Sequence, residues 1–335
     1  MTTSKMAVGL LLLLVSSSLL PPAVQSHLLP LTPDYYRKSC PRFSKIVQEV
    51  VVDKQLGFPT TAAGALRLLF HDCVVGGCDA SLLIASNAFN EAERDSPDNR
   101  DLPGDAFDVV TRAKTRLELE CPGVVSCADI LAEATRDLVS MVGGPFYGVR
   151  LGRLDATESR AGAVEGHIAR PNMSLSRIID IFAGSGLGVP EMVALAGAHT
   201  IGFSHCAQFA GRIFSEPPDP SMNPAYAEGL RKLCANYTRD PSVAAFNDPM
   251  TPGKFDNMYY LNLQRGIGLL ASDQAMAADP RTRGYVDLYA ANQTAFFQAF
   301  ARAMEKVGEM NVLLPGGGRG EVRRRCDATN TLTAA

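Results

Sequence analysis

Apolar residues recur every three to four positions over most of the chain beyond residue 40, the spacing that places them on one face of an α-helix. Asp105 and Ser174 stand where they could cap two of the predicted helices, and Pro190 falls in the first turn of a third. Strand patterns are weak, and 148–151 is the best short candidate. The pattern predicts helices at residues 42–56, 61–71, 105–119, 127–140, 174–184, 189–197, 205–214, 224–234, 256–265, 282–290 and 292–308.

Long segments without a periodic pattern separate these helices. The longest, 74–104 and 143–173, have about 30 residues each, which is long for loops in a compact domain. Disulfide bonds, metal ions or a cofactor must hold such loops, because they bury little apolar surface of their own. The chain shows no internal repeat.

Residues 1–26 differ from the rest of the chain. Lys5 precedes an apolar run at 6–20, which Pro21 and Pro22 end, and this is typical of a secretory signal peptide cleaved near Ser26. The alternative is a membrane anchor, but the run is short for a span and no later stretch is long enough. We therefore expect an exported domain at 27–335 with no membrane span.

All eight cysteines follow this leader, and an even number in a secreted chain indicates four disulfides. They are Cys40, Cys73, Cys78, Cys121, Cys127, Cys206, Cys234 and Cys326. Their number alone allows about 105 pairings. A zinc site is a weaker interpretation, because no second close pair matches Cys73 and Cys78. Sequons at Asn172, Asn236 and Asn292 also fit export.

The composition indicates a globular protein, with 46% hydrophobic and 20% charged residues. The formal net charge is −3, which gives no reason to expect binding to nucleic acid.

Arg67 and His71 stand out within the apolar helix predicted at 61–71. Four positions apart, they share one helix face, with Phe70 beside them. Burying both costs several kcal/mol unless a partner compensates. They could be a satisfied polar pair in the core, or they could line a cavity.

A second histidine, His199, follows the apolar helix predicted at 189–197 and lies among small residues. Alone it would more often be a core histidine than a ligand. Together, His71 and His199 suggest two walls of one pocket, in which a haem could use one imidazole as its axial ligand.

The chain resembles the plant secretory (class III) haem peroxidases over nearly all of residues 31–326. The resemblance is carried by Arg67-Leu-Leu-Phe-His-Asp-Cys73, Gly77-Cys-Asp-Ala-Ser81, Val125-Ser-Cys-Ala-Asp-Ile-Leu131, Gly197-Ala-His-Thr-Ile-Gly202 and Phe255-Asp-Asn-Met-Tyr-Tyr260. It implies an all-α fold of two helical lobes around one haem b, with minor short β-strands. The implied disulfides are Cys40–Cys121, Cys73–Cys78, Cys127–Cys326 and Cys206–Cys234.

The resemblance also implies roles for individual residues. On the distal side, His71 is the base, Arg67 the cation and Asn99 the residue that orients His71, while Phe70 lies at the cofactor. On the proximal side, His199 is the axial iron ligand and Asp273 accepts its other ring proton. Pro171 lies at the substrate edge.

Elementary chemistry supports these roles. A neutral imidazole can take a proton from one peroxide oxygen and return it to the other. An arginine keeps its charge while hydroxide departs. An imidazole that donates to a carboxylate becomes a stronger electron donor to iron.

The sequence also suggests calcium binding. Asp72, Asp79 and Ser81 supply oxygen ligands within ten residues, although such aspartates could merely cap turns. The resemblance implies two Ca²⁺ sites: a distal one of Asp72, Val75, Gly77, Asp79 and Ser81 linked to Glu93, and a proximal one of Thr200, Asp248, Thr251, Lys254 and Asp256.

The chain departs from the family pattern in three places. Residues 74–77 read Val-Val-Gly-Gly where Phe-Val-Asn-Gly is usual, which could loosen the packing there. The segment 99–107 is one residue longer than usual, so either Asp98 or Asn99 could contact His71. We expect Asn99, because a carboxylate would favour the charged imidazole. The sequence has no Trp, so no electron hole can rest on one.

We expect the basic run 323–325 to lie on the surface.

The implied activity is reduction of hydrogen peroxide through a ferryl intermediate, with one-electron oxidation of small phenolic donors, as in cell-wall lignin formation or the response to oxidative stress. We expect a monomer secreted to the apoplast and cell wall. A secreted haem-binding protein without turnover is the main alternative, but Arg67, His71 and Asp273 are all present. A calcium-binding module would leave His199 with Asp273 unexplained.

Overall fold

The computed structural model describes residues 30–330. Its α-helices are α1 (Phe43–Gly57), α2 (Thr61–Val74), α3 (Gly104–Glu120), α4 (Cys127–Met141), α5 (Leu175–Gly184), α6 (Val189–Ala196), α7 (Ala210–Phe214), α8 (Pro224–Leu233), α9 (Met258–Gln264), α10 (Ala271–Ala278), α11 (Arg283–Ala291) and α12 (Gln293–Gly308). The strands β1 (Phe203–His205) and β2 (Ala244–Phe246) form one small antiparallel sheet. The prediction of an all-α fold with minor strands is therefore confirmed.

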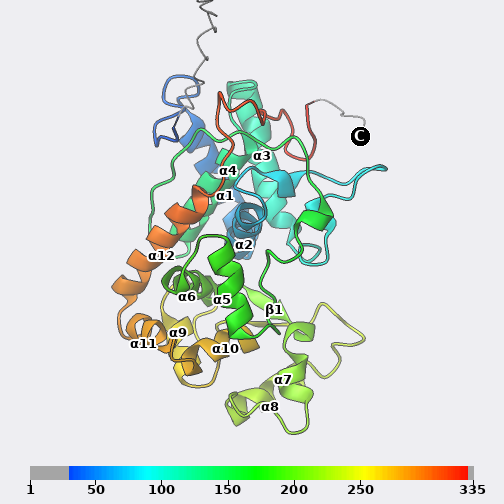
Figure 1. Ribbon diagram of the computed structural model, residues 1–335, viewed down its shortest axis with the longest axis vertical. Coiled ribbons are helices and arrows are strands. Elements are labelled where there is room, and N and C mark those ends of the chain that lie inside the picture. The colour runs from blue at the N-terminus through cyan, green and yellow to red at the C-terminus, as the bar shows by residue number, and fades with distance from the viewer. Residues whose placement is uncertain (1–29, 331–335) are drawn as a thin grey trace, which may run out of the picture.

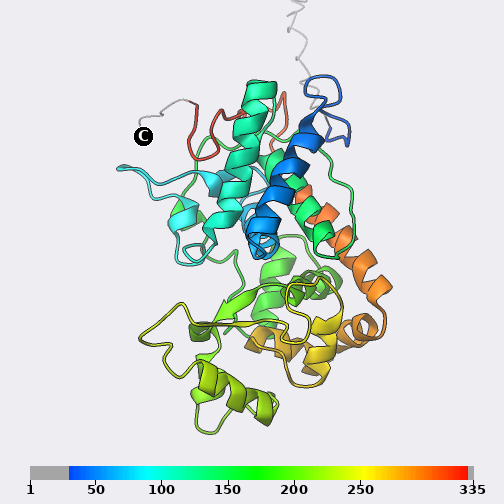
Figure 2. The same cartoon turned by 180° about the vertical axis from the view of Figure 1, so that it is seen from behind.

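The helices form two lobes (Figures 1 and 2). α1 to α4 pack on one another in one lobe, and α5 to α11 build the other. The long α12 contacts α6, α11 and α2, so it joins the two lobes. One hydrophobic cluster runs through both, and a smaller one lies beneath α7 and α8.

Most predicted helices occur within a few residues of their predicted bounds, but the one at 205–214 was wrong. His205 ends β1, a 3₁₀ turn follows at Cys206–Gln208, and only Ala210–Phe214 is α-helical. The amide of Cys206 donates to the carbonyl of Val243 (2.9 Å), and such a contact between distant segments overrides a local helical pattern.

Three smaller predictions also failed. Residues 148–151 form no strand, and only Leu151 makes an isolated bridge, to Thr32. Asp105 does not cap α3; it lies in the first turn and accepts an ion pair from Lys54 (2.9 Å). α10 was missed because its sequence is small and polar. Ser174 does cap α5, through its contact with the amide of Arg177 (3.3 Å).

Four disulfides hold the long loops: Cys40–Cys121, Cys73–Cys78, Cys127–Cys326 and Cys206–Cys234. This is the pairing that the family resemblance implies. No free cysteine remains among residues 30–330.

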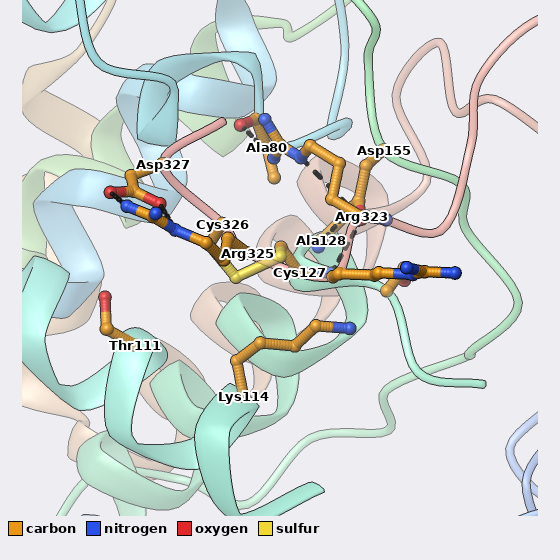
Figure 3. Close-up of a disulfide and its surroundings, with 12 residues drawn as sticks. Ala80, Thr111, Lys114, Cys127, Ala128, Asp155, Arg323, Arg325, Cys326 and Asp327 are labelled. Atoms are coloured by element: carbon orange, nitrogen blue, oxygen red, sulfur yellow. Dashed lines mark hydrogen bonds and ion pairs between the residues drawn. A yellow bond between two sulfur atoms is a disulfide. The ribbon is translucent and has the colours of Figure 1, made fainter. Parts of the chain in front are cut away.

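Cys127–Cys326 joins the C-terminal segment to the start of α4 (Figure 3). The carboxylate of Asp155 lies beside it and accepts from the amides of Cys127 (3.1 Å) and Ala128 (2.9 Å). It also accepts from the amide of Arg323 (2.9 Å), so one carboxylate fastens a helix N-terminus and the C-terminal segment together.

Arg323 corrects the expectation that 323–325 lies on the surface. Its side chain is 0% exposed; its Nη2 donates to the carbonyl of Ala80 (2.6 Å), and its Nε lies 3.8 Å from Asp155. The reason is electrostatic, because a buried carboxylate needs a nearby cation. Arg325 does lie on the surface, paired with Asp327.

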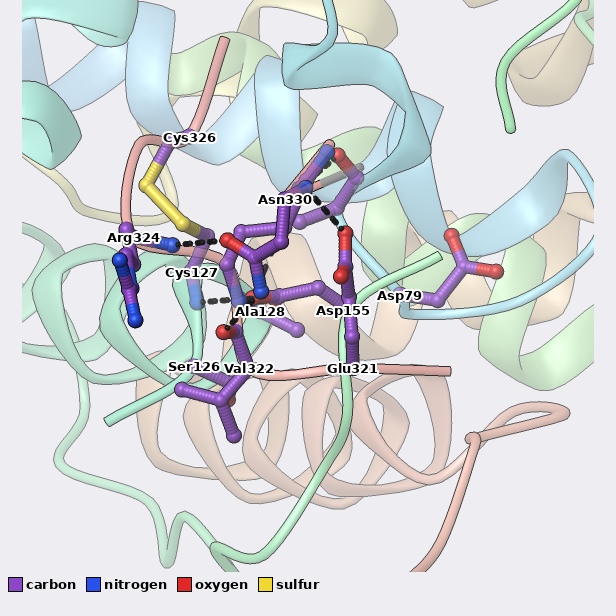
Figure 4. Close-up of polar contacts among 12 residues, drawn as sticks. Asp79, Ser126, Cys127, Ala128, Asp155, Glu321, Val322, Arg324, Cys326 and Asn330 are labelled. Atoms are coloured by element: carbon purple, nitrogen blue, oxygen red, sulfur yellow. Dashed lines mark hydrogen bonds and ion pairs between the residues drawn. A yellow bond between two sulfur atoms is a disulfide. The ribbon is translucent and has the colours of Figure 1, made fainter. Parts of the chain in front are cut away.

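Asn330 closes the same segment (Figure 4). Its side-chain oxygen accepts from the amide of Arg324 and its nitrogen donates to the carbonyl of Val322, both at 2.9 Å. The backbone of Glu321 pairs with that of Asp155 in an isolated bridge. Backbone and side-chain contacts therefore fix the segment beyond the disulfide itself.

The expected signal peptide at 1–26 lies outside the described residues. Within 30–330, no helix is by itself both long and apolar enough to cross a bilayer. The pair Leu175–Gly184 and Val189–Thr200 meets that test only jointly, and it is bent by 108°.

We predict that the disulfides contribute unequally to stability. Cys127–Cys326 closes 199 residues and Cys206–Cys234 closes 28. In the chain-entropy model the longer loop contributes about 5 kcal/mol and the shorter about 3.5 kcal/mol. Replacing each pair by alanine should therefore lower the free energy of unfolding more for Cys127–Cys326, as measured by denaturant titration. Equal losses would contradict the entropic explanation.

Candidate functional site

Arg67 and His71 lie on α2, and their side chains touch. The Nε of Arg67 donates to the Nε2 of His71 (3.3 Å), while the Nδ1 of His71 lies 2.7 Å from the Oδ1 of Asn99. An amide oxygen can only accept, so His71 carries its proton on Nδ1 and presents a lone pair at Nε2. The choice between Asp98 and Asn99 is thereby resolved in favour of Asn99.

The loop that carries Asn99 is itself fixed. The side-chain nitrogen of Asn99 donates to the backbone carbonyl of Glu93 (2.8 Å). The carboxylate of Glu93 accepts from the hydroxyl of Ser81 (3.2 Å). Glu93 therefore links Asn99 to the acidic loop. Its backbone carbonyl bonds to Asn99, and its carboxylate bonds to Ser81.

His71 is held in its neutral form. Its burial and the positive charge of Arg67 lower the pKa of His71 to about 4, although the hydrogen bond to Asn99 and the charges of Asp101 and Asp98 oppose this. A neutral imidazole with an unprotonated nitrogen can accept a proton, which is what a general base requires.

Arg67 is less buried than the sequence suggested. Its side chain is 40% exposed, and its Nη2 forms an ion pair with Asp101 at 2.8 Å. Sequence reasoning missed Asp101, which lies in the segment with the extra residue. Asp98, in the same segment, forms two hydrogen bonds with Arg170 (2.7 and 2.9 Å), so acidic side chains flank the pocket on two sides.

His199 lies in the 3₁₀ turn after α6, and its Nδ1 contacts both oxygens of Asp273 at 3.0 and 3.2 Å. Burial alone would lower the pKa of His199, but the carboxylate of Asp273 raises it above its usual value. Asp273 reaches His199 from α10, the helix that the sequence pattern missed.

The position of His199 fits a haem bound between the two histidines. The Nε2 of His199 has no partner among residues 30–330, although the ring is fixed by Asp273. The His199 side chain is 40% exposed, so its ring is accessible at this point of the fold. An oriented imidazole with a free nitrogen fits an axial ligand.

Gly197, one of the small residues beside His199, lies at a point of close packing. A Cβ at Gly197 would lie 2.4 Å from the Tyr260 hydroxyl and 2.5 Å from a ring carbon of Phe296. Gly197 therefore allows this turn to pack closely on α9 and α12.

Phe70 and Pro171 mark one side of the site. Phe70 stacks on Phe182 of α5 (5.6 Å between centroids), and both line a shallow depression with His167 and Ala169. The Pro171 carbonyl accepts from the amide of Ser272 (3.2 Å), one residue before Asp273. Pro171 thus connects this side of the site to the start of α10, the helix whose Asp273 contacts His199.

Oxygen atoms gather at both expected calcium sites. On the proximal side, the Thr200 hydroxyl lies 3.4 to 3.5 Å from oxygens of Asp248, Lys254 and Asp256, and the Thr251 hydroxyl donates to Asp248 at 2.9 Å. Within residues 30–330, no three His, Cys, Asp or Glu side chains form a metal-binding group. Any site here would depend on hydroxyl and carbonyl oxygens, donors that suit Ca²⁺.

The distal loop concentrates negative charge. Burial, together with the charges of Asp79 and Glu93, raises the pKa of Asp72 well above its usual value, and burial raises the pKa of Glu93 to about 8. Val75 follows α2 directly, and the Gly77 carbonyl accepts from the amide of Asp79 (2.9 Å). A bound cation would relieve this repulsion, so the loop fits a divalent ion.

Comparison with known proteins agrees with this geometry. A family model described as Peroxidase matches residues 46–292. Peroxidase 41 of Arabidopsis thaliana is 61% identical over 302 residues, 90% of this chain and 92% of the relative. Peroxidase 6 of the same plant is 59% identical over 325 residues, covering 96% and 98%, and its peroxidase 65 is 58% identical over 311, covering 93% and 92%.

The chain belongs to the peroxidase family. The resemblance to plant class III haem peroxidases is confirmed, and haem is the cofactor that this membership implies.

We predict that the rate at which this peroxidase reacts with hydrogen peroxide falls as the pH drops through about 4. The pKa of His71 is lowered to about 4, so the ring is neutral above that pH and gains a proton below it, where it can no longer act as a base. Stopped-flow measurement of the second-order rate constant against pH checks this. A transition near 6.5, the ordinary value for histidine, would contradict it.

An Asp101→Asn variant should move that transition to lower pH, because the charge of Asp101 raises the pKa of His71. The matched control is Asp34→Asn, which removes an exposed carboxylate paired only with Arg37. The control should keep the wild-type transition.

Proposed function

We propose that this peroxidase uses haem b, bound through His199, to reduce hydrogen peroxide and oxidise small phenolic donors in one-electron steps. The observation that supports it is the pair of oriented imidazoles, His71 held by a neutral amide and His199 held by a carboxylate. Haem supplies the redox chemistry: it takes oxidising equivalents from peroxide and passes them on to donors.

The distal residues move the protons. The Nε2 of His71 removes the proton from one peroxide oxygen and delivers it to the other, which leaves as water. Arg67 stabilises the negative charge that develops on the departing oxygen, and its Nη1 has no partner among residues 30–330. Asn99 keeps the His71 lone pair turned towards Arg67 throughout. Two donors then each lose one electron and one proton, which completes the second water.

Asp273 acts on the proximal side. By accepting the Nδ1 proton of His199, it makes the other ring nitrogen more electron-rich and fixes the direction of the ring. Pro171 and the depression beside Phe70 border the region where a flat phenol could approach.

We further propose that two Ca²⁺ ions stabilise the fold. The distal ion would be held by Asp72, Val75, Gly77, Asp79 and Ser81, with Glu93 nearby, and the proximal ion by Thr200, Asp248, Thr251, Lys254 and Asp256. We propose a monomer that is exported to the apoplast, as the leader and the sequons suggest.

His71→Leu should slow the reaction with peroxide by about 10²–10⁴-fold, the effect typical of losing a general base. The control is His205→Leu, which removes a histidine at the end of β1 that does not line the depression beside Phe70. Stopped-flow rates without donor test both variants, and haem absorption verifies cofactor binding. If His71→Leu reacts at the wild-type rate, the distal assignment is wrong and a haem-binding protein without this mechanism becomes the better interpretation.

Calcium removal should lower the melting temperature, and more so at pH 8 than at pH 6. Without the ion, the pKa of Glu93 is raised to about 8, so its contribution to stability is present at low pH and is lost as the pH rises through that value. Calorimetry before and after chelation, with metal analysis, checks this. Glu93→Gln should reduce the difference between the two pH values, and a chelated wild type without that difference would count against the distal site.

A further inference from the structure

Four tyrosines form an unbroken series of ring contacts that starts at His199. The Tyr259 ring meets the His199 ring edge to face, with centroids 6.1 Å apart. Tyr260 follows at 5.0 Å from Tyr259, Tyr289 at 5.2 Å from Tyr260, and Tyr285 at 6.4 Å from Tyr289. Each step lies within the range of direct aromatic contact. We call these four residues the tyrosine series.

The tyrosine series runs from the interior to the surface. Tyr259, Tyr260 and Tyr289 are buried, whereas Tyr285 is partly exposed on α11, which lies on the outside of its lobe (Figure 1). A route of adjacent oxidisable rings therefore connects the axial-ligand position with solvent.

Packing alone does not explain why Tyr259 is a phenol, although the Tyr260 hydroxyl has a structural role because it donates to the carbonyl of Val193 (2.9 Å). The same core contains Phe255, Phe296 and Phe300, which fill space without a hydroxyl group. Tyr259 has a buried hydroxyl with no hydrogen-bond partner, an arrangement that costs about 1–3 kcal/mol and that phenylalanine would avoid. Because the sequence has no Trp, tyrosine is the most easily oxidised aromatic side chain available.

We propose that Tyr285 is a second oxidation site, at the surface, for polymer-bound phenols that are too large to reach the haem. This inference rests on the proposed peroxidase function. One oxidising equivalent from the peroxide reaction passes along the tyrosine series as an electron moves inward from Tyr285. Tyr285 releases its phenolic proton to water and becomes a neutral phenoxyl radical. A phenol of the polymer then gives Tyr285 one electron and one proton, which restores it and leaves a polymer radical.

Tyr285→Phe tests this, with coniferyl alcohol as the small donor and a soluble, size-fractionated polymer of coniferyl alcohol as the large one. The variant keeps the ring but cannot form a phenoxyl radical. We expect kcat/KM for the polymer to fall at least about tenfold, while the value for the monomer stays within about twofold. The matched control is Tyr35→Phe, because Tyr35 is also partly exposed but its ring contact is with Tyr36, outside the series. The control should change neither value.

Electron paramagnetic resonance provides a readout independent of turnover. After peroxide is added without donor, the wild type and Tyr35→Phe should show a tyrosyl radical that Tyr285→Phe lacks. Tyr289→Phe, which interrupts the series one step earlier, should lose the same signal. If Tyr285→Phe keeps the radical and oxidises the polymer at the wild-type rate, the proposal is wrong. If the wild type does not oxidise the monomer either, the proposed function itself is wrong.

Discussion

The chemistry of this peroxidase depends on the charge of two hydrogen-bond acceptors. His71 donates to the neutral amide of Asn99 and lies beside a cation, whereas His199 donates to the carboxylate of Asp273. Their pKa values move in opposite directions: burial and the charge of Arg67 lower the pKa of His71 despite its bond to Asn99, whereas the carboxylate of Asp273 outweighs burial and raises that of His199. The proposed roles, a base on one side and an electron donor on the other, require both acceptors to be held in place by the rest of the fold.

Asp273 is held by α10, but Asn99 lies in a segment without regular secondary structure, and buried charges help to hold the long segments of that lobe. Asp155 connects the start of α4 to the C-terminal segment, and the backbone amide of the next residue donates to the carbonyl of Asp79 in the distal loop (2.8 Å). A second buried pair, Asp129 with Arg153 at 2.8 Å, ties α4 to the segment at 150–153. Breaking such a pair on one side costs about 3–5 kcal/mol, because the remaining charge stays buried. These pairs therefore act together with the disulfides and add to the hydrophobic cluster that runs through both lobes.

The sequence predicted the parts of the site that lie on periodic elements. Arg67 and His71 could be placed together because helical spacing fixes which residues share a face. The pairing of Arg67 with Asp101 could not be predicted, because it depends on the path of a loop with no periodic pattern. α10 was not predicted, for a similar reason. Its buried face includes Asp273 and Gln274, which bond to other segments instead of forming an apolar stripe. The buried position of Arg323 was also hidden, since a basic run normally indicates a solvated surface.

Asp273 links the proximal histidine to the tyrosine series, and its position decides which ring can keep a radical. Burial and the charge of Asp273 raise the pKa of Tyr259 well above its usual value, so this phenol holds its proton tightly. Loss of an electron from Tyr259 would require a proton acceptor, and the nearby carboxylate is already engaged by His199. A radical that stays on Tyr259 is therefore unfavourable, and this ring only passes the oxidising equivalent on along the tyrosine series. Tyr285 can release its proton to water, which makes the exposed end of the series the place where an oxidising equivalent comes to rest.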